Sequence, residues 1–108
     1  MMRGSFVTIA MQGDFGKPRP ALVMQSGLFD EHATVTVLPA TSMLVDTPLL
    51  RVTVLPGPES RLQKPFQVMV DKAMTVRRNR LGQASGRVGA DAMVEVERRL
   101  EVFLGAVK

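Results

Sequence analysis

Apolar and polar residues alternate in several short runs along the first part of the chain. This period of two is typical of β-strands that bury one face. The run Thr34 to Leu38 reads Thr-Val-Thr-Val-Leu, and Pro39 is expected to end it because proline cannot donate to a sheet ladder. The predicted strands are 6–11, 21–25, 34–38, 50–55 and 66–71, with a short continuation at 74–76 and a last short strand at 83–88.

The apolar residues change to a helical period near the C-terminus, with charged residues between them. Asp91 lies where a negative charge suits the first turn of a helix, and Gly105 is a suitable stop. We therefore predict a helix over 90–104 and a single helical turn at 77–81. The residues at helical spacing are Met93, Val96, Leu100, Phe103, Leu104 and Val107.

Five to seven short strands and one terminal helix predict a mainly β fold. The expected architecture is a small, strongly bent sheet or partly open barrel with the helix packed against it. The 108 residues suffice for one modest core, so a single domain over 1–108 is expected. A sheet this small leaves edge strands, and edges invite pairing with another chain, which predicts a dimer.

The composition excludes several kinds of chemistry. The chain has no cysteine, which excludes disulfides, thiolate zinc sites and a cysteine nucleophile, and which suits a reducing cytoplasm. His32 is the only histidine, so a mechanism with two histidines is impossible, and its polar surroundings predict a surface position. The acidic residues are scattered, so we expect no metal and no cofactor. No apolar run approaches the roughly 20 residues of a membrane span.

The formal net charge of +4 is compatible with an anionic partner, but a solvated charged surface is the simpler explanation. A more specific basic residue is Arg19, which lies between Pro18 and Pro20. Both prolines restrict the backbone of Arg19, and neither can donate to a ladder. The segment therefore enters a strand at an edge, with Arg19 either a preorganised catalytic cation or a surface residue.

Two further groups of polar residues end predicted strands. Thr41 and Ser42 could each hydrogen-bond a phosphate oxygen, or could instead cap a turn. Asp71 ends the strand 66–71 and shares a face with Gln67 if that strand is regular. An acid there could accept a proton or contact a nucleobase, with Gln67 beside it, or could simply pair with Lys72.

Taken in order, these motifs resemble the MazF/PemK family of toxin ribonucleases. Each motif is weak alone, but together they cover nearly the whole chain. The resemblance rests on Arg3-Gly4, Arg19-Pro20-Ala21-Leu22-Val23, Thr36-Val37-Leu38-Pro39-Ala40-Thr41-Ser42, Gln67-Val68-Met69-Val70-Asp71-Lys72 with Thr75-Val76, Arg80-Leu81-Gly82, Gly86-Arg87-Val88 and the terminal Leu104-Gly105.

The resemblance implies an SH3-like barrel with a C-terminal helix, which forms a homodimer. It implies a type II toxin–antitoxin system whose toxin cleaves single-stranded RNA without a metal, leaving a 2′,3′-cyclic phosphate and a 5′-hydroxyl. It also implies a cognate antitoxin whose flexible tail folds on the toxin. The chain carries the family's catalytic Arg and Thr as Arg19 and Thr41, and Asp71 is our candidate for accepting the 2′-hydroxyl proton. The predicted substrate-binding residues are Phe15, Lys17, Ser42 and Gln67.

The chain also departs from the family pattern. Many members have Arg where Met69 or Met74 stands here, so the missing charge would come from Lys17, Arg51 or Lys64. Two alternatives follow. One is a gyrase-poisoning toxin of the CcdB type, although the C-terminal residues fit it poorly. The other is an SH3-like binding module without catalytic activity.

Overall fold

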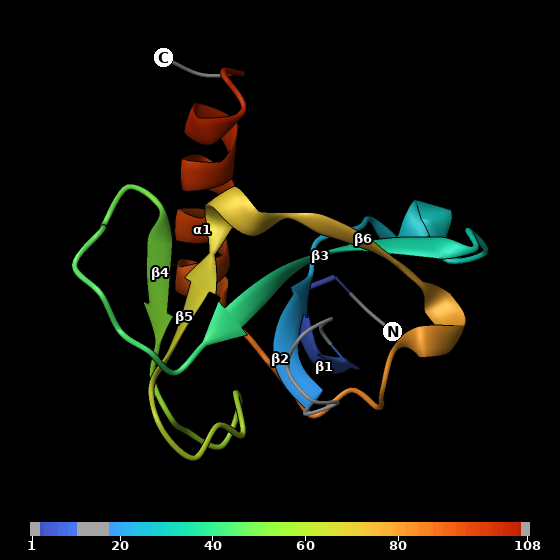
Figure 1. Cartoon of the computed structure of the whole chain (residues 1–108), viewed down its shortest axis with the longest axis horizontal. Coiled ribbons are helices and arrows are strands. Elements are labelled where there is room, and N and C mark those ends of the chain that lie inside the picture. The colour runs from blue at the N-terminus through green and yellow to red at the C-terminus, as the bar shows by residue number, and fades with distance from the viewer. Residues whose placement is uncertain (1–2, 11–17, 107–108) are drawn as a thin grey trace.

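The computed structural model describes residues 3–10 and 18–106, in which seven strands form one strongly curled sheet and one helix packs against it (Figure 1). The predicted mainly β, SH3-like architecture with a C-terminal helix is confirmed. The strands are β1 (Ser5–Ala10), β2 (Pro18–Val23), β3 (Thr34–Thr41), β4 (Arg51–Val54), β5 (Phe66–Met69), β6 (Met74–Arg77) and β7 (Gly86–Arg87). The helix is α1 (Ala90–Phe103), and three 3-10 turns are η1 (Gly27–Phe29), η2 (Val70–Lys72) and η3 (Arg78–Arg80).

Strand β3 organises the sheet, because it pairs with β2 along one side and with two strands along the other. Its first half, up to Val37, pairs with β6, and its end, from Ala40, pairs with β5. Pro39 lies between these two ladders, where its missing N–H leaves no bond unmade. The prediction that Pro39 ends the strand is therefore wrong, since β3 continues to Thr41.

Alternation along the strands gives the sheet two buried faces. Phe6, Leu22 and Leu38 belong to a core cluster that also includes Val96 of α1. Their chain neighbours point to the opposite face and form a second cluster, which includes Val7. The rest of the second cluster is Ile9, Ala21, Val23, Val35 and Val37, with Met74, Val76 and Leu81 packed against it.

Helix α1 ends one residue before the predicted boundary. Gly105 adopts the left-handed region with φ of 77°, and the amide of Ala106 donates to the carbonyl of Glu101 at 2.9 Å. This is the Schellman arrangement expected where glycine follows a helix. The predicted apolar stripe is only partly buried, because the side chains of Phe103 and Leu104 remain 49% and 68% exposed. Within the described residues, no helix combines the length and apolar character needed to cross a membrane.

The segment after β5 differs from its predicted form. The strand ends at Met69, and the chain turns into η2, where Val70 is fully buried in the core against α1 and its amide donates to Leu50 O at 2.9 Å. Asp71 therefore leaves the strand, and the prediction that Asp71 and Gln67 share a regular strand face is wrong. The last strand is also shorter than predicted, with only Gly86 and Arg87 paired to β1.

Candidate functional site

Three polar residues, Thr41, Gln67 and Thr53, form a row across the curled sheet. The β2–β3 ladder ends with Ala21 paired to Pro39, so Arg19 and Thr41 each lie two residues beyond the last pair, where the two strands separate. Thr41 pairs with Gln67 of β5, which in turn pairs with Thr53 of β4. Residues directly opposite each other in antiparallel strands share a face of the sheet. Two of the predicted catalytic residues, Arg19 and Thr41, thus lie at the end where the β2–β3 ladder opens.

The two prolines that flank Arg19 both lie in the ladder between β2 and β1. Pro18 pairs with Ala10 and Pro20 with Thr8, whereas the ladder with β3 begins only at Ala21. Arg19 is half-buried, and one side of its strand segment faces no ladder partner in β3. The prediction that this segment enters a strand at an edge is confirmed. The role of Arg19 in catalysis stays a prediction.

Thr41 ends β3 with its side chain nearly buried, at 8% exposure. Its hydroxyl oxygen accepts a hydrogen bond from the amide of Met43 at 3.1 Å, so the turn-capping interpretation is correct. A hydroxyl that accepts in this way keeps its own hydrogen for donation. Thr41 can therefore cap the turn and still donate to a phosphate oxygen, next to the exposed Ser42.

Asp71 lies outside this row, in η2. Its side chain is 22% exposed, and Lys72 Nζ lies 3.8 Å from its carboxylate, as the alternative interpretation expected. A long ion pair with an exposed lysine contributes little stability, so it does not lock the carboxylate in one position.

Gln67 is buried, and its amide is occupied within the protein. Its Oε1 accepts from the amide of Val45 at 3.0 Å, and its Nε2 donates to the carbonyl of Val45 at 2.9 Å. Gln67 therefore holds the loop 42–50 that follows β3. Sequence reasoning proposed Gln67 for substrate contact and missed this partner, which lies 22 residues away.

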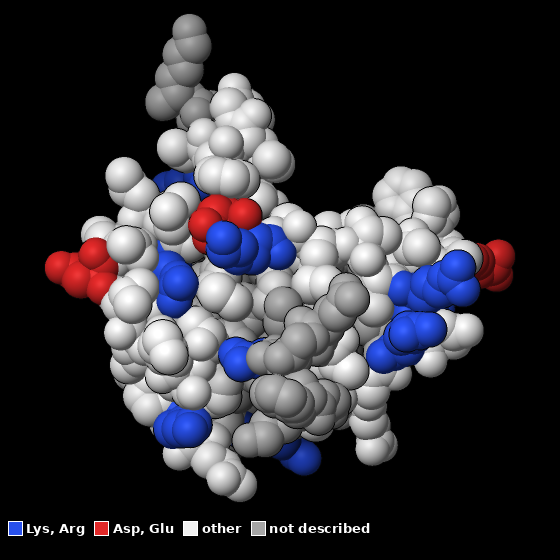
Figure 2. All heavy atoms as spheres, viewed as in Figure 1, with Lys and Arg blue, Asp and Glu red and all other residues white. Residues whose placement is uncertain are grey.

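The remaining predicted residues fall in different places. Phe15 and Lys17 lie outside the described residues. Lys64 is exposed, and His32 is exposed as predicted. Over the described ranges 3–10 and 18–106, His, Asp and Glu side chains form no group of three that could hold a metal ion. Figure 2 shows that blue, basic side chains appear at more places than red, acidic ones on the face seen in Figure 1, which suits an anionic ligand.

Comparisons with known proteins identify relatives of this fold. A model of the PemK-like, MazF-like toxins of type II toxin–antitoxin systems matches residues 2–104. A probable endoribonuclease MazF of Mycolicibacterium smegmatis is 43% identical over 106 residues, which is 97% of this chain and 97% of that protein.

Solved structures show the same fold. An endoribonuclease in complex with its cognate antitoxin, from a mycobacterial species, superimposes with a TM-score of 0.80 at 23% identity, covering 100% of this chain and 98% of that one. MazF in a MazE–MazF complex of Deinococcus radiodurans gives a TM-score of 0.77 at 27% identity, covering 97% and 95%.

The chain thus has the fold of these structures, a small β-barrel with a C-terminal helix. More narrowly, the chain belongs to the PemK-like, MazF-like toxin family of type II toxin–antitoxin systems, since the family model covers almost all of it. This confirms the family resemblance found in the sequence and favours it over the CcdB-type alternative.

Proposed function

We propose that this toxin is a single-domain, metal-independent endoribonuclease that cleaves single-stranded RNA at short sequences in the cytoplasm. The observation that carries the proposal is that Arg19 and Thr41 both lie two residues beyond the last pair of the β2–β3 ladder, at its open end. The 43% identity with a probable endoribonuclease MazF supports it. A guanidinium and a hydroxyl donor at one end of a ladder are suited to a phosphodiester, whose charge rises in the transition state.

The ribose 2′-oxygen attacks the adjacent phosphorus, and the 5′-oxygen of the next nucleotide leaves. Asp71 accepts the 2′-hydroxyl proton, and the leaving oxygen takes up a proton to become a 5′-hydroxyl, so the other product ends in a 2′,3′-cyclic phosphate. Arg19 stabilises the growing negative charge, because arginine stays protonated and is no base. Thr41 donates to a phosphate oxygen, and in the proposed mechanism Ser42 does the same.

We also propose the partners that the family resemblance implies. The chain acts as a homodimer, and a cognate antitoxin neutralises it through a flexible tail that folds on binding. The mycobacterial endoribonuclease of similar fold, which is in complex with its cognate antitoxin, supports this proposal. Phe15 and Lys17 are proposed to stack on a base and to contact phosphate, respectively.

The decisive experiment uses purified protein, a long single-stranded RNA and excess EDTA. We expect cleavage at a few sites, with 5′-hydroxyl and 2′,3′-cyclic phosphate ends identified by end-specific labelling. Cleavage that needs added Mg²⁺ would contradict the proposed mechanism. RNA that stays intact at micromolar protein, while still binding to it, would instead identify a binding module.

A further inference from the structure

The loop 42–50 between β3 and β4 has an unusual combination of exposed apolar side chains and a fixed backbone. Met43 is 75% exposed and Leu49 is 76% exposed, and Leu44 and Val45 are also exposed. The loop starts immediately after Thr41, which is the proposed phosphate donor. Its apolar side chains thus lie next in sequence to the point where the scissile phosphate would bind, and exposed methionine is common on adaptable binding surfaces.

The middle of the loop is held by Gln67 from β5. The two hydrogen bonds between its amide and the backbone of Val45 imitate the pairing of one strand residue with another. Arg51 from β4 adds a third contact, because its Nη1 donates to the carbonyl of Met43 at 3.3 Å. Arg51 and Gln67 both belong to paired strands, so the sheet holds the backbone from which each anchoring side chain extends to the loop.

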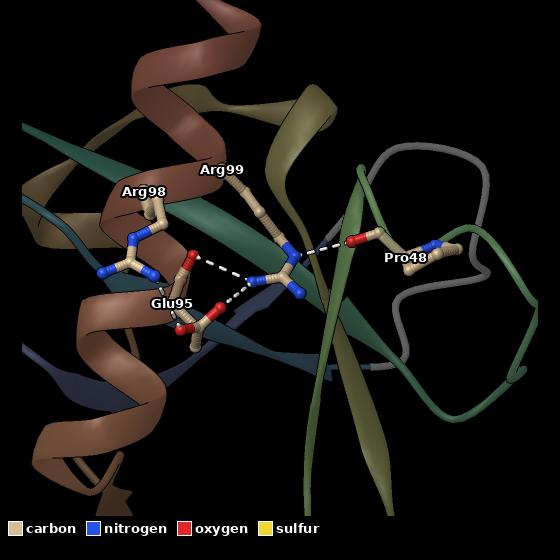
Figure 3. Close-up of polar contacts among 4 residues, drawn as sticks. All are labelled: Pro48, Glu95, Arg98 and Arg99. Atoms are coloured by element: carbon tan, nitrogen blue, oxygen red, sulfur yellow. Dashed lines mark hydrogen bonds and ion pairs between the residues drawn. The ribbon is translucent and has the colours of Figure 1, made fainter. Parts of the chain in front are cut away.

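The far end of the loop is held by helix α1. Arg99 Nε donates to the carbonyl of Pro48 at 2.6 Å, while its Nη1 pairs with the carboxylate of Glu95 one turn earlier (Figure 3). The hydrogen bond from Arg99 lowers the pKa of the Glu95 carboxyl below its usual value. Arg98 also lies near Glu95, at 3.6 Å, and Figure 3 draws no polar contact between Arg98 and Pro48.

The three anchors line an open pocket of about 340 Å³ between the loop, β4, β5 and α1. The side of the loop that faces this pocket is therefore held mainly by these hydrogen bonds. Releasing the tether at Pro48 would let the exposed side chains adopt several arrangements, because the carbonyl would lose its fixed donor.

We propose that Gln67, Arg51 and Arg99 are positioning residues that hold the loop in the shape that selects the RNA bases beside the scissile phosphate. The inference rests on the proposed function and deepens it. Gln67 acts on the substrate through the loop and not by touching it. The occupant of the exposed loop surface is an unpaired base of the RNA, because the loop continues directly from Thr41 and Ser42.

The test compares Arg99→Ala with Arg98→Ala. Both variants remove one arginine from the same helix and one partner from Glu95, but Arg99 donates a hydrogen bond to the loop backbone, whereas Arg98 only lines a pocket beside Pro48 and Leu49. The cleavage site is first mapped on a long RNA. Then kcat and KM are measured for short RNAs that contain the site or differ from it by one flanking base. Size-exclusion chromatography and thermal unfolding report the oligomeric state and the fold of each variant.

For Arg99→Ala we expect KM on the preferred RNA to rise and discrimination against the one-base variants to fall about tenfold, because misplaced binding groups lose their geometry. The value of kcat should stay unchanged, as should all parameters of Arg98→Ala. If Arg99→Ala does not fold, Arg99→Lys replaces it. Lysine keeps the positive charge, but its ammonium cannot donate to Pro48 and Glu95 with the planar geometry of a guanidinium. Discrimination against the one-base variants should therefore fall for Arg99→Lys as well.

Unchanged discrimination in a folded Arg99 variant would overturn the inference while leaving the proposed function intact. An equal rise in KM on all RNAs, or an altered oligomeric state, would also contradict the inference. The exposed side chains of the loop would then contact something other than an RNA base, such as a second copy of the chain. A wild-type protein that cleaves no RNA would remove the proposed function and this inference with it.

Discussion

Replacing Arg19 by alanine should lower the rate of RNA cleavage at least about 100-fold, the order lost when one donor to a transition state is removed. The reason is its position, since Arg19 lies at the open end of the β2–β3 ladder, as Thr41 does, and is flanked by two prolines that restrict its backbone. The backbone that carries the guanidinium is therefore restricted before the charge on the phosphate develops. Single-turnover cleavage of a short RNA by excess protein measures this step without product release.

The fold should survive this substitution, because Arg19 is half-buried at a strand end and lies outside both core clusters. Circular dichroism and gel filtration of the Arg19→Ala protein should match the wild type. Arg98→Ala is the control for the loss of one positive charge, and it should cleave at the wild-type rate. Arg19→Lys should recover only part of the activity, since an ammonium lacks the planar fork. Full activity of Arg19→Ala would exclude Arg19 from the mechanism.

The departure at Met69 has a structural counterpart. Arg51 of β4 pairs directly with Met69 of β5, so a guanidinium is present on the same face, one strand away. Lys64 is exposed in the loop before β5, and Lys17 lies outside the described residues. Of the three cations suggested by the sequence, Arg51 is thus the one that the structure places beside Met69. Because Arg51 donates a hydrogen bond to the loop 42–50, our proposal gives it the role of positioning that loop.

The sequence predicted those features that depend on local pattern. Alternation located most strands, the helical period located α1, and Pro18 and Pro20 located the strand entry of Arg19. The pattern failed where distant segments decide the structure. Pro39 stays within β3 because β6 and β5 pair on either side of it along the strand, which no local signal reveals.

The anchoring of the loop 42–50 was hidden for the same reason. Arg99 and Pro48 are 51 residues apart, and Gln67 and Val45 are 22 apart. Each is an ordinary residue in its own segment, and only the packing of α1 and β5 beside the loop gives it a role. At Asp71 the local pattern was misleading. Burial of Val70 against α1 turns the chain there, and the turn moves Asp71 off the strand on which alternation had placed it.

Gly86→Ala should lower the free energy of unfolding by about 3 kcal/mol, the upper part of the usual cost of overpacking. A Cβ at this position would lie 2.0 Å from the carbonyl oxygen of Ser60 and 2.6 Å from its carbonyl carbon. Both atoms belong to the backbone, so no side-chain rotation relieves the contact. The neighbours also restrict any shift, since the amides of Ser85 and Arg87 donate to Phe6 and Glu59 respectively, each at 2.9 Å.

The matched control is Gly57→Ala, because a Cβ there would meet no atom within 4 Å. It should change the free energy of unfolding by no more than about 0.5 kcal/mol, as is usual at open surface positions. Urea unfolding at a single protein concentration measures both variants. If Gly86→Ala proves as stable as Gly57→Ala, then β7 and the turn at Ser60 separate easily. The close approach of these segments would then contribute little to holding β7 against β1 at the end of the sheet.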